Sequence, residues 1–329
     1  MIPEELKKTI KDDDNFLISS HMNPDGDAIG GVLAIGWLLN KLGKRHVIVL
    51  NNPPSEKFRY LSEFEKMLSY SDDIKTDFND PNKVWVPRNL IVVDSPNLER
   101  LENVKKLLSK DMKIINIDHH ESNSFFGDIN YVDLKAGAST EMIYDVILSF
   151  GIPLDKDAAE YIYTGIVIDT GRFRFSNTTP KSLEISAKLL ETGARVSYIA
   201  EWLYHTNSAE TLKGLGVLLN SLEIGANGRV AFVHFDNTFL KRNDISKIDT
   251  EGFVNYPLSI EGVKVAAFLQ EHEKGKIRVS LRSKDTINVN EIAKVFGGGG
   301  HDKAAGCRIN GTISDAKRLL MGEIGKRFN

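Results

Sequence analysis

Phe16-Leu17-Ile18-Ser19-Ser20-His21-Met22-Asn23-Pro24-Asp25-Gly26-Asp27 is the stretch that decides the fold of this chain. Its first five residues have the apolar and small side chains of a buried β-strand, and Asn-Pro-Asp-Gly then forces a tight turn. From about Ala28 to Leu42 the apolar residues recur at helical spacing, and Gly43 stands where a helix C-cap belongs. A strand that turns directly into a helix is the building unit of a parallel α/β sheet.

The turn between this strand and this helix carries side chains capable of chemistry. Open α/β sheets place their ligands at the carboxyl ends of the strands. The turn would therefore direct the imidazole of His21 and the carboxylates of Asp25 and Asp27 into the same space. On its own, the segment is read equally well as a polar turn with an N-capping aspartate.

The same alternation of strand and helix continues to about residue 190. Further strands are predicted at His46–Leu50, Leu90–Val93 and Lys113–Ile117. A helix is predicted from Ser139 to Phe150, and another begins at Thr179-Pro180 and ends at Gly193. This order predicts an α/β fold with a mostly parallel, doubly wound sheet covered on both faces.

A second domain is predicted after this region. Residues 194–222 are helix-prone, and the strand candidates beyond them are Val230–Phe235, Val263–Gln270, Ile277–Arg282 and a strand near Ala305–Ile309. We therefore predict a first α/β domain at 1–193, a helical connector at 194–222 and a smaller α/β domain at 223–329. A final helix capped by Ser314 is expected to close the chain.

Composition and charge exclude several classes of protein. The chain has 41% hydrophobic and 26% charged residues, as in an average soluble protein, and its most apolar run, Ala28–Leu39, is too short to cross a bilayer. The acidic N-terminus does not resemble a signal peptide, and Cys307 is the only cysteine, so we expect a cytoplasmic protein with no membrane partner. The net charge of −3, without a basic block, argues against binding of long duplex DNA but allows a small anion in a local pocket.

Three further apolar segments end in side chains that can bind metals. Asp94 closes the strand 90–93, Asp118-His119-His120 closes the strand 113–117, and Asp169 follows Ile166-Val167-Ile168. Each carboxylate alone could be an ordinary turn or capping residue. Four segments that all end in this way can converge on one crevice, and this combination favours a metal site.

The order His-x-x-x-Asp-x-Asp, strand-end Asp, Asp-His-His and Asp-Thr-Gly resembles the four motifs of the DHH phosphoesterase family. Gly297–Gly300 with His301, followed by Ala304-Ala305-Gly306, resembles the associated C-terminal domain of that family's nucleotide-directed members. The resemblance spans both predicted domains and is strongest to the bacterial nanoRNase/pAp phosphatase group. One departure is Arg172, at a position that is usually small, and it leaves the fine substrate preference open.

This resemblance implies two divalent metal ions and a ligand set for each. One ion would be held by His21, Asp25 and Asp94, and the other by Asp27, Asp94, His119 and Asp169. Oxygen and imidazole ligands suit Mn²⁺ or a related ion, and two divalent cations would offset the charge of four carboxylates. Asp118 would orient a metal-binding imidazole, and His120 would contact the phosphate or protonate the leaving oxygen.

The substrate is expected to bind mainly to the second domain. Arg278, Ser280 and Arg282 alternate along one strand and so share a face, and arginine makes bidentate contacts to phosphate. From the residues alone, a solvated strand face and a flexible glycine loop are equally open. The resemblance implies substrate binding by Arg278, Arg282, His301 and the backbone of Gly298, Gly299 and Gly300, with Arg100 as a further phosphate contact.

We therefore expect a Mn²⁺-dependent hydrolase that acts on short single-stranded oligoribonucleotides and on adenosine 3′,5′-bisphosphate (pAp). The alternatives are a phosphodiesterase for linear or cyclic dinucleotides, a pyrophosphatase and a non-enzymatic nucleotide-binding protein. The Gly-Gly-Gly-Gly-His element counts against a pyrophosphatase because pyrophosphate has no base or sugar, and the complete ligand set counts against a non-enzyme. Whether the chain forms a homodimer stays open.

Overall fold

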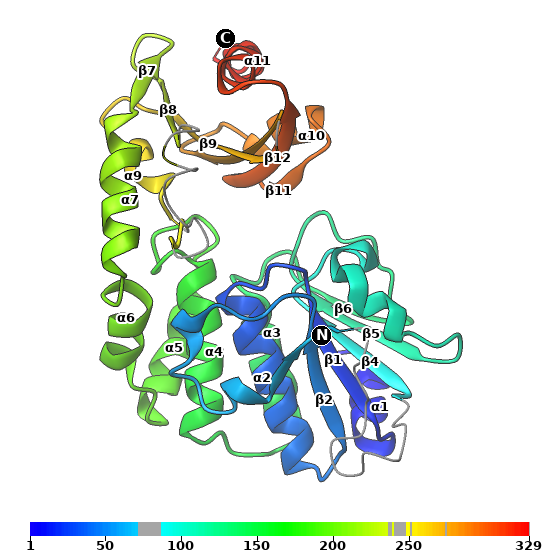
Figure 1. Cartoon of the computed structure of the whole chain (residues 1–329). Helices are drawn as coiled ribbons and strands as arrows, with labels where there is room; N and C mark the ends of the chain where they lie inside the picture. The colour runs from blue at the N-terminus through cyan, green and yellow to red at the C-terminus, as the bar shows by residue number, and fades with distance from the viewer. Residues whose placement is uncertain (72–86, 236–238, 240–247, 251, 274, 329) are drawn as a thin grey trace. The chain divides into compact units, whose positions relative to one another are not determined.

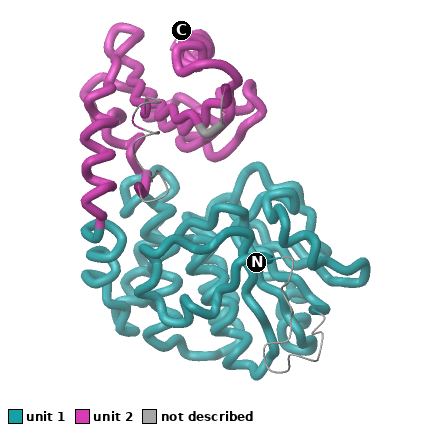
Figure 2. The backbone as a smooth tube through the Cα atoms, viewed as in Figure 1, with its two compact units in different colours: residues 1–206 teal, residues 207–329 magenta. Residues whose placement is uncertain are grey.

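The computed structural model describes residues 1–71, 87–235, 239, 248–250, 252–273 and 275–328 (Figure 1). The chain divides into two compact units, residues 1–206 and 207–329 (Figure 2). The division falls inside the segment 194–222 that we expected to connect two domains. Helix α6 (Val196–Tyr204) belongs to the first unit and helix α7 (Ala209–Asn220) to the second.

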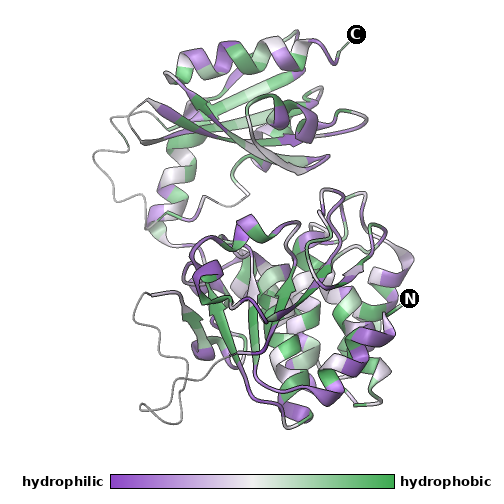
Figure 3. Cartoon of the chain, turned by 90° about the vertical axis from the view of Figure 1, so that its right-hand side faces the viewer, coloured by the Kyte–Doolittle hydropathy of each residue, from purple (hydrophilic) through white to green (hydrophobic). Residues whose placement is uncertain are grey.

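The first unit contains a six-stranded parallel sheet in the order β3-β2-β1-β4-β5-β6, which confirms the predicted fold class. Its strands are β1 (Phe16–Ser20), β2 (His46–Leu50), β3 (Met67–Ser69), β4 (Asn89–Val93), β5 (Lys113–Asp118) and β6 (Ile129–Val132). Strands β1 and β4 are buried at every residue, as is typical of parallel strands covered on both faces. In Figure 3 the strands of this sheet are coloured mainly as hydrophobic.

Helices cover both faces of this sheet. They are α1 (Glu4–Asp12), α2 (Gly26–Lys41), α3 (Ser139–Ser149), α4 (Lys156–Asp169), α5 (Pro180–Glu191) and the 3-10 segments η1 (Glu56–Phe58), η2 (Phe64–Lys66) and η3 (Leu98–Leu107). Ile18 of β1 packs in one core with α2, α3 and α4, whereas Leu17 packs on the opposite face with residues of η3. Helices α2 and α4 approach closely, because a Cβ on Gly30 would lie 2.3 Å from the carbonyl oxygen of Tyr161.

The second unit contains a mixed six-stranded sheet in the order β11-β12-β10-β9-β8-β7, in which only β8 and β9 pair in parallel. Its strands are β7 (Glu223–Gly225), β8 (Val230–His234), β9 (Val265–Glu273), β10 (Lys276–Ser283), β11 (Gly299–His301) and β12 (Ala304–Asn310), and its other helices are α9 (Asn255–Leu258), α10 (Val289–Val295) and α11 (Ile313–Gly325). Residues of α10 and α11 pack in one core with β9, β10 and β12.

One local prediction for this unit was wrong, and one alternative that the sequence left open is excluded. The cap of α11 is Thr312 and not Ser314, because Thr312 accepts a hydrogen bond from the backbone N–H of Asp315 while the Asp315 carboxylate accepts from the N–H of Thr312. The flexible-loop interpretation of the glycine run also fails at Gly299 and Gly300, which belong to strand β11. Among the described residues, no helix combines the length and the apolar character needed to span a membrane.

Candidate metal centre and substrate-binding face

The candidate site lies at the carboxyl ends of β1, β4 and β5. From β1 the chain proceeds through β2 and β3 to one edge of the sheet, and from β4 through β5 and β6 to the other. A sheet whose connections diverge in this way leaves a crevice at the carboxyl ends of the two central strands. His21 follows β1 and Asp94 follows β4 at this point, and Asp118 ends β5.

The carboxylate of Asp94 lies between two histidines. Its Oδ2 is 3.5 Å from Nε2 of His21, and its Oδ1 is 3.6 Å from Nε2 of His119. Nε2 of His119 is also 3.4 Å from Oδ2 of Asp169. Possible ligand atoms of His21, Asp25 and Asp94 lie within 4.8 Å of one another, and so do those of Asp27, Asp94 and His119. The structure therefore brings the predicted ligands together as two donor groups that share Asp94.

The backbone of Asp94 has an unusual conformation. Its φ of +55° lies in the left-handed region, which costs a non-glycine residue about 1–3 kcal/mol unless its surroundings hold it there. The N–H of Asp94 donates to the carbonyl oxygen of Ile117 on β5 at 2.9 Å. This contact holds the turn after β4 in the conformation that places the carboxylate between the two histidines.

The geometry of Asp25 is compatible with both of the roles that the sequence left open. Its Oδ1 accepts from the backbone N–H groups of Asp27 at 3.0 Å and Ala28 at 3.2 Å, so it caps the N-terminus of α2. The cap uses Oδ1 and leaves Oδ2 for another partner. One carboxylate can therefore both cap α2 and serve the donor group of His21 and Asp94.

Asp27 is held by the first residues of α3, which sequence reasoning missed. Its Oδ2 accepts from the N–H of Ser139 at 2.6 Å, and its Oδ1 accepts from the N–H and the hydroxyl of Thr140 at 3.0 and 2.6 Å. The Ser139 hydroxyl donates to Oδ1 of Asp94 at 3.1 Å. The positive end of the α3 dipole thus faces two of the predicted ligands. The only signal in the sequence was a pair of hydroxyl residues at the start of a predicted helix.

The two adjacent histidines have different partners. Nδ1 of His119 lies 3.1 Å from the carbonyl oxygen of Ala136, so this nitrogen carries a proton, and Nε2 is the ring nitrogen that lies toward Asp94 and Asp169, where it could bind a metal ion. This arrangement is typical of metal-binding histidines. The carboxylate of Asp118 lies 2.7 Å from Nδ1 of His120. Asp118 therefore orients His120 and not the expected ligand His119.

Asp169 lies at the end of α4 and is held by Asn177. The Asn177 amide donates to Oδ2 of Asp169 at 3.2 Å, to its carbonyl oxygen at 3.1 Å and to the carbonyl oxygen of Gly137 at 2.9 Å. The sequence could not decide whether Asp169 ended a strand or a helix, and the structure shows a helix. Asn177 is a second supporting residue that the sequence did not reveal.

The crowding of these carboxylates changes their proton affinities. Burial, together with the charges of Asp94 and Asp169, raises the pKa of Asp27 well above its usual range. Burial also raises the pKa of Asp169 to about 7, with His119 opposing and Asp25 and Asp94 adding to the effect. Burial lowers the pKa of His119, but the nearby carboxylates outweigh it and raise the value to about 10. Without cations the cluster therefore retains protons near neutral pH, and its oxygen and imidazole donors fit a pair of divalent ions that would replace those protons.

Arg100 lies beside this cluster. Its carbonyl oxygen accepts from the N–H of Met22, next to His21, at 2.7 Å. Its Nε is buried and has no hydrogen-bond partner within the described part of the chain, and no carboxylate there lies within ion-pair distance. An arginine whose buried N–H group has no partner beside a candidate metal centre is suited to bind a phosphate oxygen.

In the second unit, the predicted substrate-binding residues lie on one face of the sheet. Burial alternates along β10, so Arg278, Ser280 and Arg282 lie on its less buried face, as expected. Arg282 pairs with Ala304 of β12, and Ala304 pairs in turn with His301 of β11. Directly paired residues point to the same face, so Arg282 and His301 flank a small side chain in one row.

The other sets of residues paired across the strands on this face also have small or basic side chains. Ser280 pairs with Gly306, which pairs with Gly299, so this row has almost no side-chain bulk. Arg278 pairs directly with Arg308, a residue that the sequence analysis did not single out. Like charges directly opposite one another destabilise a sheet, and a bound anion would relieve this repulsion.

Two glycines of the run are required by the packing of the backbone, which the sequence analysis did not predict. A Cβ on Gly298 would lie 2.1 Å from the carbonyl oxygen of Gly306, and one on Gly300 would lie 2.4 Å from that of Ala304. Both glycines are therefore needed for β11 to approach β12. Because β11 is an edge strand, alternate backbone N–H groups point away from the sheet, where an anion could reach them.

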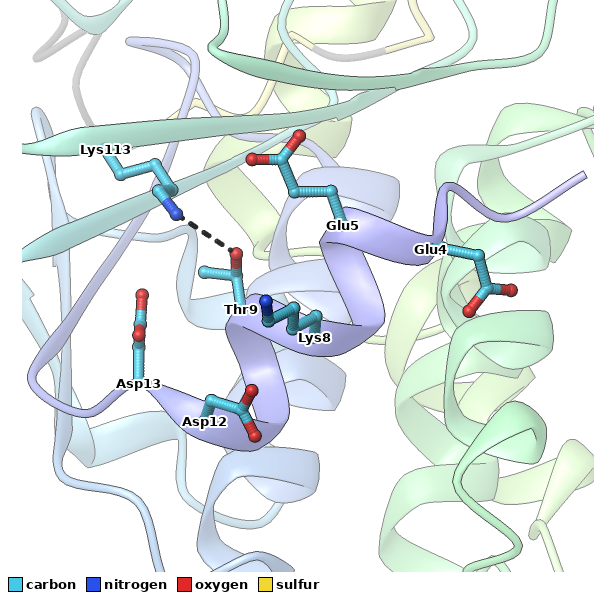
Figure 4. Close-up of a pocket in the computed structure, with 7 residues that line it drawn as sticks. All are labelled: Glu4, Glu5, Lys8, Thr9, Asp12, Asp13 and Lys113. Carbon is cyan, nitrogen blue, oxygen red and sulfur yellow. Dashed lines mark hydrogen bonds between the residues drawn. The ribbon is translucent and has the colours of Figure 1, made fainter.

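A surface hollow of about 470 Å³ lies elsewhere on the first unit (Figure 4). Its lining residues are all charged or polar: Glu4, Glu5, Lys8, Thr9, Asp12, Asp13 and Lys113. Lys113 begins β5, whereas the candidate metal centre is at the other end of that strand. The hollow has no histidine in its lining and takes no part in the site.

Comparisons with known proteins agree with this geometry. A sequence profile described as the DHH family, N-terminal domain, matches residues 15–166, and one described as the DHHA1 domain matches residues 227–324. The chain is 32% identical over 298 residues to a bifunctional oligoribonuclease and PAP phosphatase NrnA from Thermus thermophilus, covering 91% of this chain and 85% of that protein. It is 30% identical over 327 residues to the Bacillus subtilis protein of the same name, covering 96% of each.

One solved structure is similar over nearly the whole chain. An exopolyphosphatase-related protein from Bacteroides fragilis has a TM-score of 0.88 and 27% identity, covering 98% of this chain and 95% of that one. Both domains, in their order along the chain, are thus found together in related proteins. The chain therefore belongs to the DHH family of phosphoesterases and is a hydrolase with a C-terminal DHHA1 domain.

Proposed function

We propose that this protein is a cytoplasmic, Mn²⁺-dependent phosphoesterase that hydrolyses short oligoribonucleotides to mononucleotides and pAp to AMP. The observation that carries the proposal is the pair of donor groups that share Asp94. It is supported by relatives named as bifunctional oligoribonuclease and PAP phosphatase, which match more than nine-tenths of this chain.

The residues at the strand ends would hold two ions. His21, Asp25 and Asp94 would hold one, and Asp27, Asp94, His119 and Asp169 the other. Bound divalent cations would polarise the phosphoryl group and offset the charge that develops on its oxygens. Hydrogen bonds donated by Ser139, Thr140 and Asn177, and the bond that the Ala136 carbonyl oxygen accepts from His119, hold these side chains in place before substrate binds.

His120 is suited to donate a proton to the leaving oxygen. Burial lowers its pKa, but the hydrogen bond to Asp118 and the charge of Asp94 outweigh burial and raise it. Asp118 is itself held by the amide of Asn123 at 2.6 Å. With Nδ1 bound to Asp118, the imidazolium would use Nε2 to protonate the oxygen that leaves phosphorus.

The face that carries Arg282 and His301 would bind the nucleotide end of the substrate. Two basic groups on either side of Ala304 leave a flat area that a sugar or base can occupy, while arginine binds phosphate. Arg278, Arg308 and Arg100 would contact further phosphate oxygens. With a net charge of −3 the chain offers no long basic track, which favours short substrates.

A chromatographic time course with Mn²⁺ tests this proposal. The substrates are pAp, linear and cyclic dinucleotides, pyrophosphate, polyphosphate and RNA of two to about twenty nucleotides, with chelated enzyme as the control. We expect rapid release of mononucleotides from the shortest RNAs and of AMP from pAp. Hydrolysis confined to pyrophosphate or polyphosphate would overturn the proposal, and a strong preference for cyclic dinucleotides would correct the substrate.

A further inference from the structure

The residues that follow Asp169 form a strained loop. Gly171, Arg172 and Phe173 have φ values of +56°, +64° and +60°, so three consecutive residues adopt the left-handed conformation. For the two that are not glycine this costs about 1–3 kcal/mol each, and such strain persists only where the surroundings hold it. We call residues 171–176 the Arg/Phe loop, because its sequence is Gly-Arg-Phe-Arg-Phe-Ser.

Hydrogen bonds hold the Arg/Phe loop against the end of α4. The N–H of Arg172 donates to the carbonyl oxygen of Val167 at 2.7 Å, and the N–H groups of Arg174 and Phe175 both donate to that of Thr170 at 3.0 Å. The N–H of Phe173 donates to the Thr170 hydroxyl at 3.2 Å. At its far end the loop is followed by Asn177, which binds the Asp169 carboxylate. The loop is thus tied at both ends to a candidate metal ligand.

The side chains of the loop present two cations and an aromatic ring to solvent. The guanidinium of Arg172 lies over the ring of Tyr204, 3.9 Å from its centre, and Nε of Arg174 donates to the carbonyl oxygen of Gly171 at 2.9 Å. Both arginines are exposed, and no carboxylate in the described ranges lies within ion-pair distance of either. Their terminal N–H groups therefore remain available to an anion.

The ring of Phe175 is exposed but held in position. It is 42% exposed. A Cβ on Gly171 would lie 2.5 Å from the ring, so the ring lies directly against the backbone of that residue. One side of the ring is supported by Gly171, which lies two residues after Asp169 in sequence, while much of the remainder of the ring is open.

We propose that the Arg/Phe loop is a nucleotide-binding element, in which Phe175 stacks on a base and Arg174 binds the adjoining phosphate. A base-stacking ring beside an uncompensated arginine is the combination with which proteins bind single-stranded nucleic acid without reading its sequence. Arg172 adds a second cation, held over the ring of Tyr204. The inference rests on the proposed function, because it assigns a binding site to the substrate of that reaction.

The test is equilibrium binding of two non-hydrolysable probes by the Mn²⁺-loaded protein. The first is a dinucleotide in which a methylene group replaces the scissile oxygen, and the second is the same molecule without its bases. Phe175→Ala should weaken binding of the first probe about 5- to 150-fold and leave the second nearly unchanged. Phe175→Trp should retain binding of both. Arg174→Gln should weaken both probes, because both contain the phosphate.

Two control variants and one further assay distinguish a wrong stacking role for Phe175 from general damage to the protein and from a wrong proposed function. Leu148→Ala, at the exposed far end of α3, and Arg59→Gln, an exposed arginine elsewhere on the first unit, should bind both probes as the native protein does. Metal content, measured by elemental analysis, reports on the metal centre and should be the same in Phe175→Ala as in native protein. If Phe175→Ala binds the dinucleotide as tightly as native protein, or loses both probes equally, the stacking role is wrong. If native protein binds the dinucleotide through Phe175 but hydrolyses no oligonucleotide, the proposed function fails and the binding site stands.

Discussion

Replacing Gly165 with alanine tests how closely α4 approaches the metal centre. Gly165 lies in the middle of α4, where a glycine-to-alanine change ordinarily stabilises a helix by about 0.5–1 kcal/mol. Here the added Cβ would lie 2.3 Å from the Thr140 hydroxyl and 2.5 Å from Oδ1 of Asp27. Both neighbours are fully buried, so neither can move into solvent.

The magnitudes predict that steric cost exceeds the gain in helix propensity. Forcing an additional carbon into a packed interior costs about 1–3 kcal/mol. Displacing the Thr140 hydroxyl also breaks its bond to the Asp27 carboxylate, and a bond to a charged group is worth about 1.5–3 kcal/mol. After the gain of up to about 1 kcal/mol is subtracted, we expect a net loss of about 1.5–5 kcal/mol and weaker metal binding.

Urea unfolding followed by tryptophan fluorescence measures this loss. The three tryptophans are residues 37, 85 and 202, all in the range 1–206, so their fluorescence reports on the first unit. Gly216→Ala in α7 is the control, because nothing lies within 4 Å of its added Cβ, and the fluorescence transition should not change. In a Thr140→Ala background the cost of Gly165→Ala should shrink. A Gly165→Ala protein that is as stable as native and binds as much metal would refute this reasoning.

Four further predictions concern the metals and the substrate. Asp94→Ala removes the donor that both groups share, so hydrolysis should cease and elemental analysis should find fewer than two ions per chain; two retained ions would rule out the shared role. In metal-free protein the free energy of unfolding should fall between about pH 6 and pH 9. The pKa of Asp169 is raised from 3.8 to about 7 by folding, so its contribution to the free energy of unfolding is lost as the pH rises through that range. The pKa of His119 is raised from 6.5 to about 10, so its contribution is lost between those two pH values. Urea titrations should show this slope, and a rise in stability would contradict it. Arg282→Ala and His301→Ala should each lower kcat/KM about 10- to 150-fold with normal metal content; unchanged rates would place the substrate elsewhere. Finally, kcat/KM should be highest for RNA of two to about five nucleotides, and equal efficiency at twenty would indicate a longer binding track.

The sequence predicted the central strands well because their burial is visible in it. Strands β1 and β4 are continuous apolar or small runs, and the rule that ligands lie at the carboxyl ends of parallel strands then grouped the candidate ligands without any coordinates. Strands β3 and β6 were not predicted. They are only three and four residues long, and such short runs carry little periodic signal.

The supporting contacts of the site could not be predicted, because they depend on tertiary packing. Thr140 is 113 residues from Asp27 in sequence, and the partner of His119 is a backbone carbonyl group, which no residue type marks. The pairing of Arg278 with Arg308 likewise depends on the register of two strands. Residue type and spacing indicate which groups can bind a metal or a phosphate, but they do not indicate which groups hold them in position.

Strand β11 also bears on whether this edge of the sheet can pair with another copy of the chain. An edge strand with unpaired N–H groups can be extended by a strand from another molecule, which is a route to aggregation. Here the edge is three residues long, two of them glycine, so it offers a poor template for pairing. Basic side chains at His301 and Arg282 would further repel an identical edge at low pH. The features that would let this edge bind a nucleotide therefore also disfavour strand pairing with another copy of the chain.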